Sequence, residues 1–145
     1  MTARHGILIV VADGEHARFV QPADNHALHT IASFDALTAH QRTSDLGDDA
    51  PGATYHTGST AHHALNPRHD RHGLEMASFA KFVARQIDAW DQPYERLLLI
   101  APAHSSSGIA SHLKAGTKAK IIGIIGKDLT RTPDNALKDH IEYNI

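Results

Sequence analysis

The sequence predicts an α/β fold built on a mixed, five-stranded sheet. Two apolar runs, residues 7–12 and 97–100, have the composition of strands that are buried on both faces. The first run is followed by alternating segments joined by turns, whereas helical patterns separate the later strands. Hydrophobic residues make up 41% of the 145 residues and charged residues 21%, enough for one packed core. We therefore expect a single domain over residues 1–145.

The first 35 residues predict an antiparallel meander. The strand at 7–12 ends at Asp13-Gly14, a dipeptide typical of hairpin turns. Two more strands follow, separated by a turn at 22–26. Along residues 16–21, Ala17 and Phe19 fall on one side, and along residues 28–33, Leu28, Thr30 and Ala32 alternate against His29, Ile31 and Ser33. These three strands should pair with each other in sequence order.

A polar stretch over about residues 38–72 follows, and it is rich in histidine and punctuated by glycine and proline. We interpret it as one long loop. A loop of this length inside a compact domain is uncommon unless it has a function.

The second half alternates helices and strands. Residues 70–90 predict a helix whose apolar stripe runs from Met76 through Phe79, Ala80, Val83 and Ile87 to Trp90. A strand over 96–101, a helix over 106–114 and a second buried strand over 121–125 follow. Thr132 is the expected N-cap of a last helix, with Pro133 in its first position.

The resulting order, βββαβαβα, is that of the ribonuclease-H-like architecture. The last two strands should be parallel, because a helix separates them. A doubly wound sheet would have begun with β-α-β.

Composition excludes several classes of protein. The chain has no cysteine, which rules out disulfides and thiolate metal sites. The run at 7–12 is too short to cross a bilayer, and we expect a cytoplasmic protein without membrane insertion. The formal net charge of −2 gives no global basic excess, although a local patch can still bind nucleic acid.

Short motifs spread along nearly the whole chain indicate a family. In order, they are Ala12-Asp13-Gly14 with Ala17-Arg18, Ser44-Asp45, Pro51-Gly52, His63-Ala64-Leu65 with Pro67, Glu75 with Phe79-Ala80, Leu97-Leu98-Leu99-Ile100-Ala101-Pro102, and Lys127-Asp128-Leu129-Thr130. With these motifs the chain resembles the bacterial host attachment proteins, the proteins required for attachment to host cells.

That family is in turn similar to the central domain of archaeal and eukaryotic class-I peptide release factors. The resemblance implies a ribonuclease-H-like fold and an association with RNA or the ribosome. The release factors' Gly-Gly-Gln tripeptide is missing, since the comparable loop reads Thr57-Gly58-Ser59-Thr60. Family members also tend to carry an arginine in the helix after Ala101-Pro102, where this chain has none between 103 and 113.

Four acidic residues are candidates for catalysis by a two-metal hydrolase: Asp13, Asp45, Glu75 and Asp128. Such chemistry needs the carboxylates to converge on one spot. The alternative for Asp13 is a turn residue that bonds the backbone two residues on. The alternative for Asp128 is an ion pair with Arg18, and Glu75 can equally be solvated or paired with Arg68 or Arg71.

Histidines in the polar stretch are weak candidates for a zinc or nickel site: His62, His63, His69 and His72. Their spacing does not preorganise a tetrahedron, so we expect a hydrated loop and no metal or other cofactor.

Basic residues are candidates for binding: Arg18, Arg68, Arg71, Lys114, Lys118 and Lys120. The last three form a cluster that can meet RNA phosphates, and the alternative is a solvated helix end. Three functions stay open at this point. The leading one is a binding domain with RNA or the ribosome as partner, and the others are a metal-dependent hydrolase of nucleic acid or a small phosphoester, and a protein–protein adaptor.

Overall fold

The computed structural model describes residues 6–37, 39 and 67–141, with the side chains of the long helix described from Met76 onward. Its elements are β1 (Ile7–Ala12), β2 (His16–Pro22), β3 (Leu28–Asp35), α4 (Pro67–Asp88), β4 (Arg96–Ile100), α5 (Ala103–His112), α6 (Ala115–Lys118), β5 (Ile121–Ile125), α7 (Asp134–Leu137) and the 3₁₀ turn η1 (Lys138–His140). The predicted α/β class and the predicted order of strands and long helices are confirmed.

The five strands form one mixed sheet in the order β3-β2-β1-β4-β5. β1 pairs antiparallel with β2, and β2 with β3, so the opening meander is confirmed. β1 and β4 pair parallel, as do β4 and β5. This arrangement is compatible with the ribonuclease-H-like architecture.

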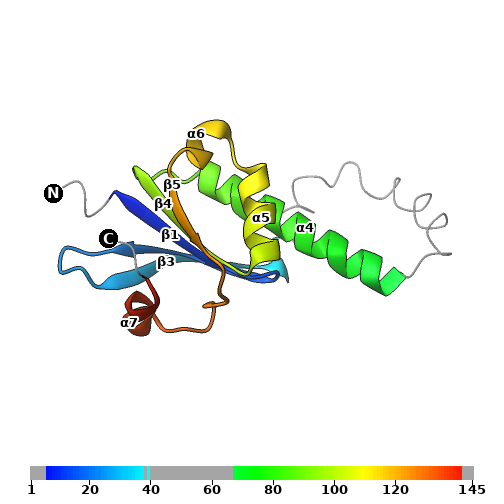
Figure 1. Ribbon diagram of the computed structural model, residues 1–145, viewed down its shortest axis with the longest axis horizontal. Helices are drawn as coiled ribbons and strands as arrows, with labels where there is room; N and C mark the ends of the chain where they lie inside the picture. Colours follow the sequence, from blue (N-terminus) through cyan, green and yellow to red (C-terminus); the bar gives the residue numbers. More distant parts are fainter. Residues whose placement is uncertain (1–5, 38, 40–66, 142–145) are drawn as a thin grey trace.

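Both faces of the sheet are covered, by different parts of the chain (Figure 1). Helices α4 and α5 lie against one face, where Leu8, Val10 and Phe19 are buried. The C-terminal segment with α7 covers the other face, and there Leu137 is fully buried. All six residues of β1 are inaccessible to solvent, because this strand lies in the middle of the sheet and contributes to both cores.

The predicted stripe of α4 packs on the sheet. Phe79, Ala80, Val83 and Ile87 are buried, and Trp90 contacts Phe19 edge to face at 5.1 Å between ring centroids. The stripe was too narrow, however, because Phe82 and Ala84 are buried as well. Phe82 packs edge to face on Phe34 of β3, with 5.6 Å between ring centroids, and α5 packs beside α4. A one-face pattern does not predict such additional contacts.

Several predicted boundaries differ from the observed ones. α4 begins at Pro67 and not at residue 70, so the end of the predicted loop is helical; proline is tolerated there because the first residue of a helix needs no N–H partner. Helical residues also occur at 36, 37 and 39. Residues 38 and 40–66, the rest of the predicted loop, lie outside the described residues.

The two later helices also differ from prediction. The expected helix over 106–114 is α5, starting at residue 103, and a separate short helix, α6, follows it. Thr132 does not cap the last helix: Pro133 is the N-cap, without a side-chain hydrogen bond, and α7 starts at Asp134. No helix among the described residues is long and apolar enough to cross a membrane.

β5 is the clearest correction. The predicted bounds are observed, but the strand is not buried, since it lies at one edge of the sheet. Ile122 and Ile124 are 37% and 46% exposed. An apolar run does not distinguish an edge strand from a central strand, because both bury at least one face.

Candidate functional site

The topology marks one end of the sheet as the place for a site. The chain leaves β1 toward β2 on one side, and it leaves β4 through α5 and α6 toward β5 on the other side. In open α/β sheets, ligands bind beyond the carboxyl ends of the strands at such a switch point. Asp13 follows β1 directly and Asp128 follows β5, so two of the candidate carboxylates belong to this end.

Asp13 builds the hairpin turn. Its Oδ1 accepts the backbone N–H of Glu15 at 2.8 Å and that of His16 at 2.6 Å. The ring Nδ1 of His16 lies 3.6 Å from the same oxygen. The interpretation of Asp13 as a turn residue is thus confirmed.

Thr130 joins the two aspartates. Its hydroxyl lies 3.2 Å from Asp13 Oδ2 and 2.6 Å from Asp128 Oδ1, and its backbone N–H donates to Asp128 Oδ1 at 3.1 Å. The hydroxyl bond from Thr130 is the main cause that lowers the pKa of Asp128, aided by the Thr130 N–H and by the positive charges of Arg131 and His16, against a smaller effect of burial. These contacts favour the ionised carboxylate of Asp128 over its protonated form.

Arg18 holds the loop that carries these residues. From β2 its guanidinium donates to the carbonyl oxygens of Thr130 and Thr132, and its Nε lies 3.6 Å from Asp134 Oδ1. The carboxylate paired with Arg18 is therefore that of Asp134, not that of Asp128. Asp134 also accepts the backbone N–H and the hydroxyl of Thr30 at 2.8 and 2.7 Å, which ties β3 to the same loop.

A pocket opens beside this network, with a volume of about 440 Å³. Its lining residues come from the hairpin turn, from α4 and from the last loop: Asp13, Gly14, Glu15, His16, Met76, Asp128, Arg131 and Thr132. The hairpin approaches α4 closely here: a Cβ at Gly14 would lie 2.9 Å from Cε of Met76, so the end of the methionine side chain would have to move. Three carboxylates and one arginine give the pocket the chemistry of a site for a polar, cationic or zwitterionic ligand.

The remaining candidate carboxylates are not placed in this pocket. Asp45 lies outside the described residues, and Glu75 lies in α4 next to Met76 with its side chain undescribed. Within the described part of the chain, no three histidine, aspartate or glutamate side chains come together to hold a metal ion. The convergence expected for a two-metal hydrolase is thus seen for one pair, Asp13 and Asp128.

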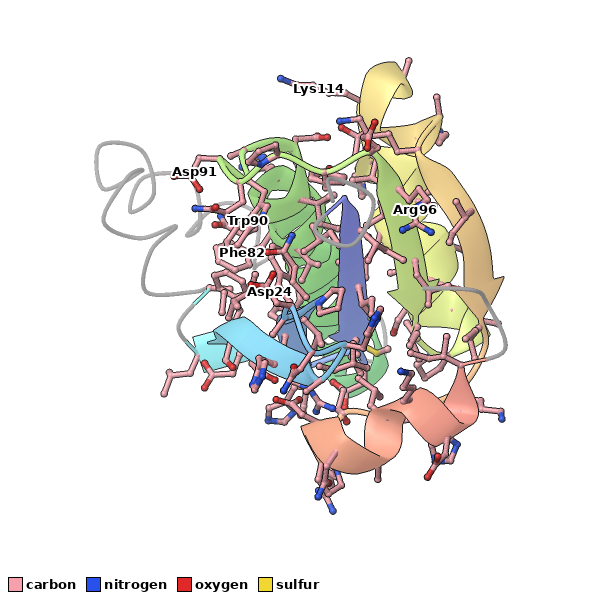
Figure 2. All side chains as sticks on the ribbon, turned by 90° about the vertical axis from the view of Figure 1, so that its left-hand side faces the viewer. Asp24, Phe82, Trp90, Asp91, Arg96 and Lys114 are labelled. Carbon is pink, nitrogen blue, oxygen red and sulfur yellow. The ribbon has the colours of Figure 1, made fainter. Side chains whose placement is uncertain are left out.

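The predicted lysine cluster lies at the opposite end of the sheet, where β5 begins. Lys114 and Lys118 are exposed around α6, and Figure 2 shows Lys114 pointing away from the body of the molecule. Lys120 is engaged instead, since its Nζ donates to the Tyr94 carbonyl at 3.2 Å and lies 4.4 Å above the Tyr94 ring. Its ammonium therefore has less freedom to reach a ligand than those of Lys114 and Lys118.

Charge is segregated along the chain. Residues 96–127, which form β4, α5, α6 and β5, contain five lysine and arginine residues and no aspartate or glutamate. The rest of the chain has nine cations and 16 acids, a formal charge of −7. The segment that forms β4, β5 and the two helices between them is thus basic, although the protein as a whole has a net charge of −2. In space, the Asp88 carboxylate of α4 lies beside this segment, 3.3 Å from the Lys114 backbone nitrogen.

The candidates in the histidine-rich segment have only a partial placement. Arg68, His69, Arg71 and His72 lie in the first turns of α4, so His69 and His72 are one helical turn apart along the backbone. Their side chains are undescribed, and His62 and His63 lie outside the described residues. The expectation that these histidines hold no metal is therefore untested, and the contribution of Arg68 and Arg71 to an RNA-binding surface stays a prediction.

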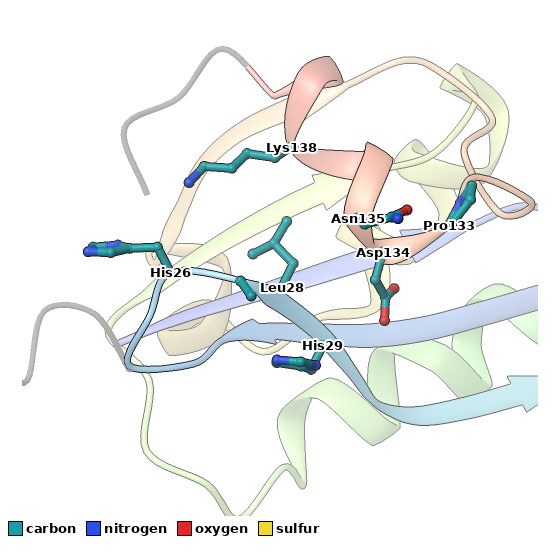
Figure 3. A pocket seen from close by; sticks show the side chains of 8 residues that line it. His26, Leu28, His29, Pro133, Asp134, Asn135 and Lys138 are labelled. Atoms are coloured by element: carbon teal, nitrogen blue, oxygen red, sulfur yellow. The ribbon is translucent and has the colours of Figure 1, made fainter.

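A second pocket lies between the start of β3 and α7 (Figure 3). Leu28 forms its apolar floor, while Lys138 and His26 extend at one end and Asp134 turns toward β3 at the other. His26 has a positive φ of 70°, a conformation that glycine adopts more easily. The Asp134 carboxylate already accepts hydrogen bonds from Thr30 and contacts Arg18. Lys138 is therefore the charged side chain of this pocket that is available to a ligand.

Sequence reasoning did not foresee Thr130 and Asp134. An Asp-x-Thr sequence such as Asp128-Leu129-Thr130 is typical of a side-chain-bonded turn, which signals the first of them. Asp134 gave no such signal, because its partners Arg18 and Thr30 are more than 100 positions away.

Comparison with known proteins agrees with these motifs. A family model described as "protein required for attachment to host cells" matches residues 8–141. No curated protein matches the chain. The matched range contains the whole sheet apart from its first residue, the Arg18–Asp134 contact and both pockets. The chain belongs to the family of proteins required for attachment to host cells.

Proposed function

We propose that this member of the host attachment family is a binding domain whose basic segment, residues 96–127, contacts RNA, free or in the ribosome. One observation carries the proposal: the five cations of residues 96–127 have no acidic residue among them, and Lys114 and Lys118 extend from an exposed turn. Phosphate groups are the natural partners of such a surface, since each neutralised phosphate releases a counterion.

The resemblance to release-factor central domains supports the choice of RNA over other polyanions. Without the Gly-Gly-Gln tripeptide, the proposed role is binding and not peptide release. The low aromatic content of 6% points to contacts with the phosphate backbone in place of base stacking.

The test is fluorescence anisotropy with a labelled, mixed-sequence RNA hairpin over a range of salt concentrations. The double variant Lys114→Glu/Lys118→Glu should bind at least about tenfold more weakly, and its salt slope should fall by about two, one for each phosphate that a lysine no longer neutralises. Cosedimentation with ribosomes should weaken in parallel.

A matched control keeps the change of charge the same. Lys81 on α4 and Lys138 in η1 are both exposed and lie outside the basic segment. The double variant Lys81→Glu/Lys138→Glu should bind RNA almost as the parent does. Equal losses in the two double variants would mean that only net charge matters, and the proposed surface would be wrong.

A second candidate function, a metal-dependent phosphoesterase, is favoured by the meeting of Asp13 and Asp128 at Thr130. Asp13 Oδ1 already accepts two backbone N–H groups of the turn, which favours a structural role. Its Oδ2 lies 3.2 Å from the Thr130 hydroxyl, whose single hydrogen has a nearer acceptor in Asp128 at 2.6 Å. Hydrolysis of bis(p-nitrophenyl) phosphate that requires Mg²⁺ or Mn²⁺ and disappears in Asp128→Asn would favour the enzyme instead.

A further inference from the structure

The pocket between β3 and α7 lies at the opposite edge of the sheet from β5. Its volume is about 590 Å³, within the roughly 300–1,000 Å³ of pockets that hold small organic molecules. The hairpin between β2 and β3 forms one side, and α7 with the first residue of η1 forms the other (Figure 3). A site here is separate from the basic segment and from the pair of Asp13 and Asp128.

The floor of this pocket is apolar. Leu28 forms it and is only 6% exposed, while Pro133, the N-cap of α7, lines the pocket from the helix side. Leu28 also belongs to the same buried cluster as Leu137 of α7. The floor is therefore part of a packed core, and a hydrocarbon group that covers it removes apolar surface from water without any rearrangement of the fold.

One end of the pocket carries hydrogen-bond donors and a positive charge. Figure 3 shows the side chains of Lys138 and His26 extending there, and both residues are exposed. Among the described residues, none forms an ion pair or a hydrogen bond with the Lys138 ammonium or the His26 ring. The one carboxylate of the pocket, Asp134, turns toward β3 and is engaged by Thr30 and Arg18. The charge that remains for a ligand is therefore positive.

His26 occupies a backbone position that favours glycine. Residues 24–26 form a three-residue hairpin loop, which the Ala23 N–H closes by donating to the Ala27 carbonyl at 2.8 Å. The third residue of such a loop adopts the left-handed conformation, and His26 has a φ of 70°. A histidine is more strained there than a glycine, so the geometry of the hairpin does not explain its presence. A ring that donates a hydrogen bond to a ligand in the pocket does explain it.

We propose that this pocket binds a small organic carboxylate with a hydrocarbon body. The Lys138 ammonium pairs with the carboxylate, the His26 ring donates a hydrogen bond to it, and the hydrocarbon lies over Leu28. The single ammonium matches the single charge of a carboxylate. A phosphate ester has further charge and a third oxygen, and it needs additional donors such as an arginine fork, which the described lining does not contain.

The test is an NMR titration of the full, isotope-labelled chain with naphthalene-2-carboxylate. Naphthalene-2-carboxamide, which has the same shape and no charge, is the control probe. The carboxylate should shift the backbone amides of residues 26–29 and 134–138, and its dissociation constant should be about tenfold lower than that of the carboxamide, because the ion pair and the charge-assisted hydrogen bond are both lost in the neutral probe. Decanoate, titrated in the same way, tests a flexible hydrocarbon body.

Lys138→Met isolates the contribution of the ammonium. It should weaken binding of the carboxylate about fivefold, the upper range for an exposed ion pair, and leave binding of the carboxamide unchanged. Lys127→Met is the matched control, because Lys127 is an exposed lysine beyond β5, at the other edge of the sheet. It should bind both probes as the parent does.

His26→Gly separates binding from stability. Glycine adopts the positive φ of this position without strain, so the free energy of unfolding should stay the same or rise. Binding of the carboxylate should nevertheless weaken about threefold, because the donor at the end of the pocket is lost. A residue that served only the hairpin would not change the affinity in this way.

Four results would overturn the proposal: no binding of either carboxylate, equal affinity for the carboxylate and the carboxamide, amide shifts outside the pocket, or parent affinity in Lys138→Met. The proposal does not depend on the RNA function. Lys138→Met keeps Lys114 and Lys118 and should bind RNA as the parent does, whereas Lys114→Glu/Lys118→Glu should bind the carboxylate as the parent does. Failure of one proposal can thus be distinguished from failure of the other.

Discussion

Replacing Arg18 by methionine removes the clamp on the last loop and keeps the aliphatic part of the side chain. The parent guanidinium donates to two backbone carbonyls, those of Thr130 and Thr132, and its side chain is only 13% exposed. A hydrogen bond from a charged donor contributes about 1.5–3 kcal/mol, so two give about 3–6 kcal/mol. The contact with Asp134, which is 32% exposed, adds at most about 1 kcal/mol.

Two effects reduce this sum. The guanidinium Nε is buried without a hydrogen-bond partner, which lowers the stability of the parent. The methionine variant does not have this desolvation penalty. The carbonyls are part-buried and regain some water. We therefore expect Arg18→Met to lower the free energy of unfolding by about 3 kcal/mol, a large share of the roughly 5–15 kcal/mol of an ordinary domain.

Urea denaturation measures the change from the midpoint at constant slope. Arg131→Met is the matched control, because Arg131 is an exposed arginine in the same loop, and its loss should change stability by no more than about 0.5 kcal/mol. A result for Arg18→Met within that same range would refute the reasoning, since it would mean that the loop is held by its apolar contacts alone.

Four further changes test the packing and the titrating groups. Phe79→Ala should cost about 3–5 kcal/mol in urea denaturation, because Phe79 is 2% exposed, whereas Leu37→Ala at 66% exposure should have almost no effect. Gly14→Ala should lower the free energy of unfolding by about 1 kcal/mol, because the new Cβ would lie 2.9 Å from Cε of Met76. The loss should be smaller when the same change is made in a Met76→Ala variant, and equal losses would place the strain elsewhere. Burial raises the pKa of Tyr94 above its ordinary 10.0, the Asp88 charge raises it further, and a hydrogen bond with Thr117 lowers it. The protonated Tyr94 therefore contributes stability below pH 10.0, and this stability is lost as the pH rises through the raised pKa. Melting curves of Tyr94→Phe should lack this alkaline loss. The pKa of Asp128 is lowered, chiefly by the Thr130 hydroxyl. The contribution of the ionised Asp128 to stability is therefore present above its ordinary pKa of 3.8 and is lost as the pH falls through the lowered value. In an NMR titration of Thr130→Val the Asp128 pKa should rise, and an unchanged pKa would contradict the assignment.

Local signals predicted the strands well. β1 and β5 have the predicted bounds because each apolar run is flanked by glycine, aspartate or lysine, and Asp13-Gly14 placed the first hairpin. The start of α4 was misplaced because Pro67 was grouped with Pro51 of the preceding polar stretch, although proline is also favoured at the first position of a helix. The break between α5 and α6 was not predicted, because neither glycine nor proline stands at Leu113-Lys114. The Lys114 backbone N–H donates there to the Asp88 carboxylate of α4 at 3.3 Å, and no local sequence pattern reveals such a distant partner.

The candidate site was predictable in part for a similar reason. Asp13 and Asp128 were identified because each follows a strand, and parallel topology brings such positions to the same end of the sheet. Which carboxylate Arg18 would contact was not predictable, since Asp128 and Asp134 stand on either side of Thr130 and Thr132 in one short loop. Only the three-dimensional path of that loop selects Asp134 for the guanidinium and leaves Asp128 to the threonine hydroxyl.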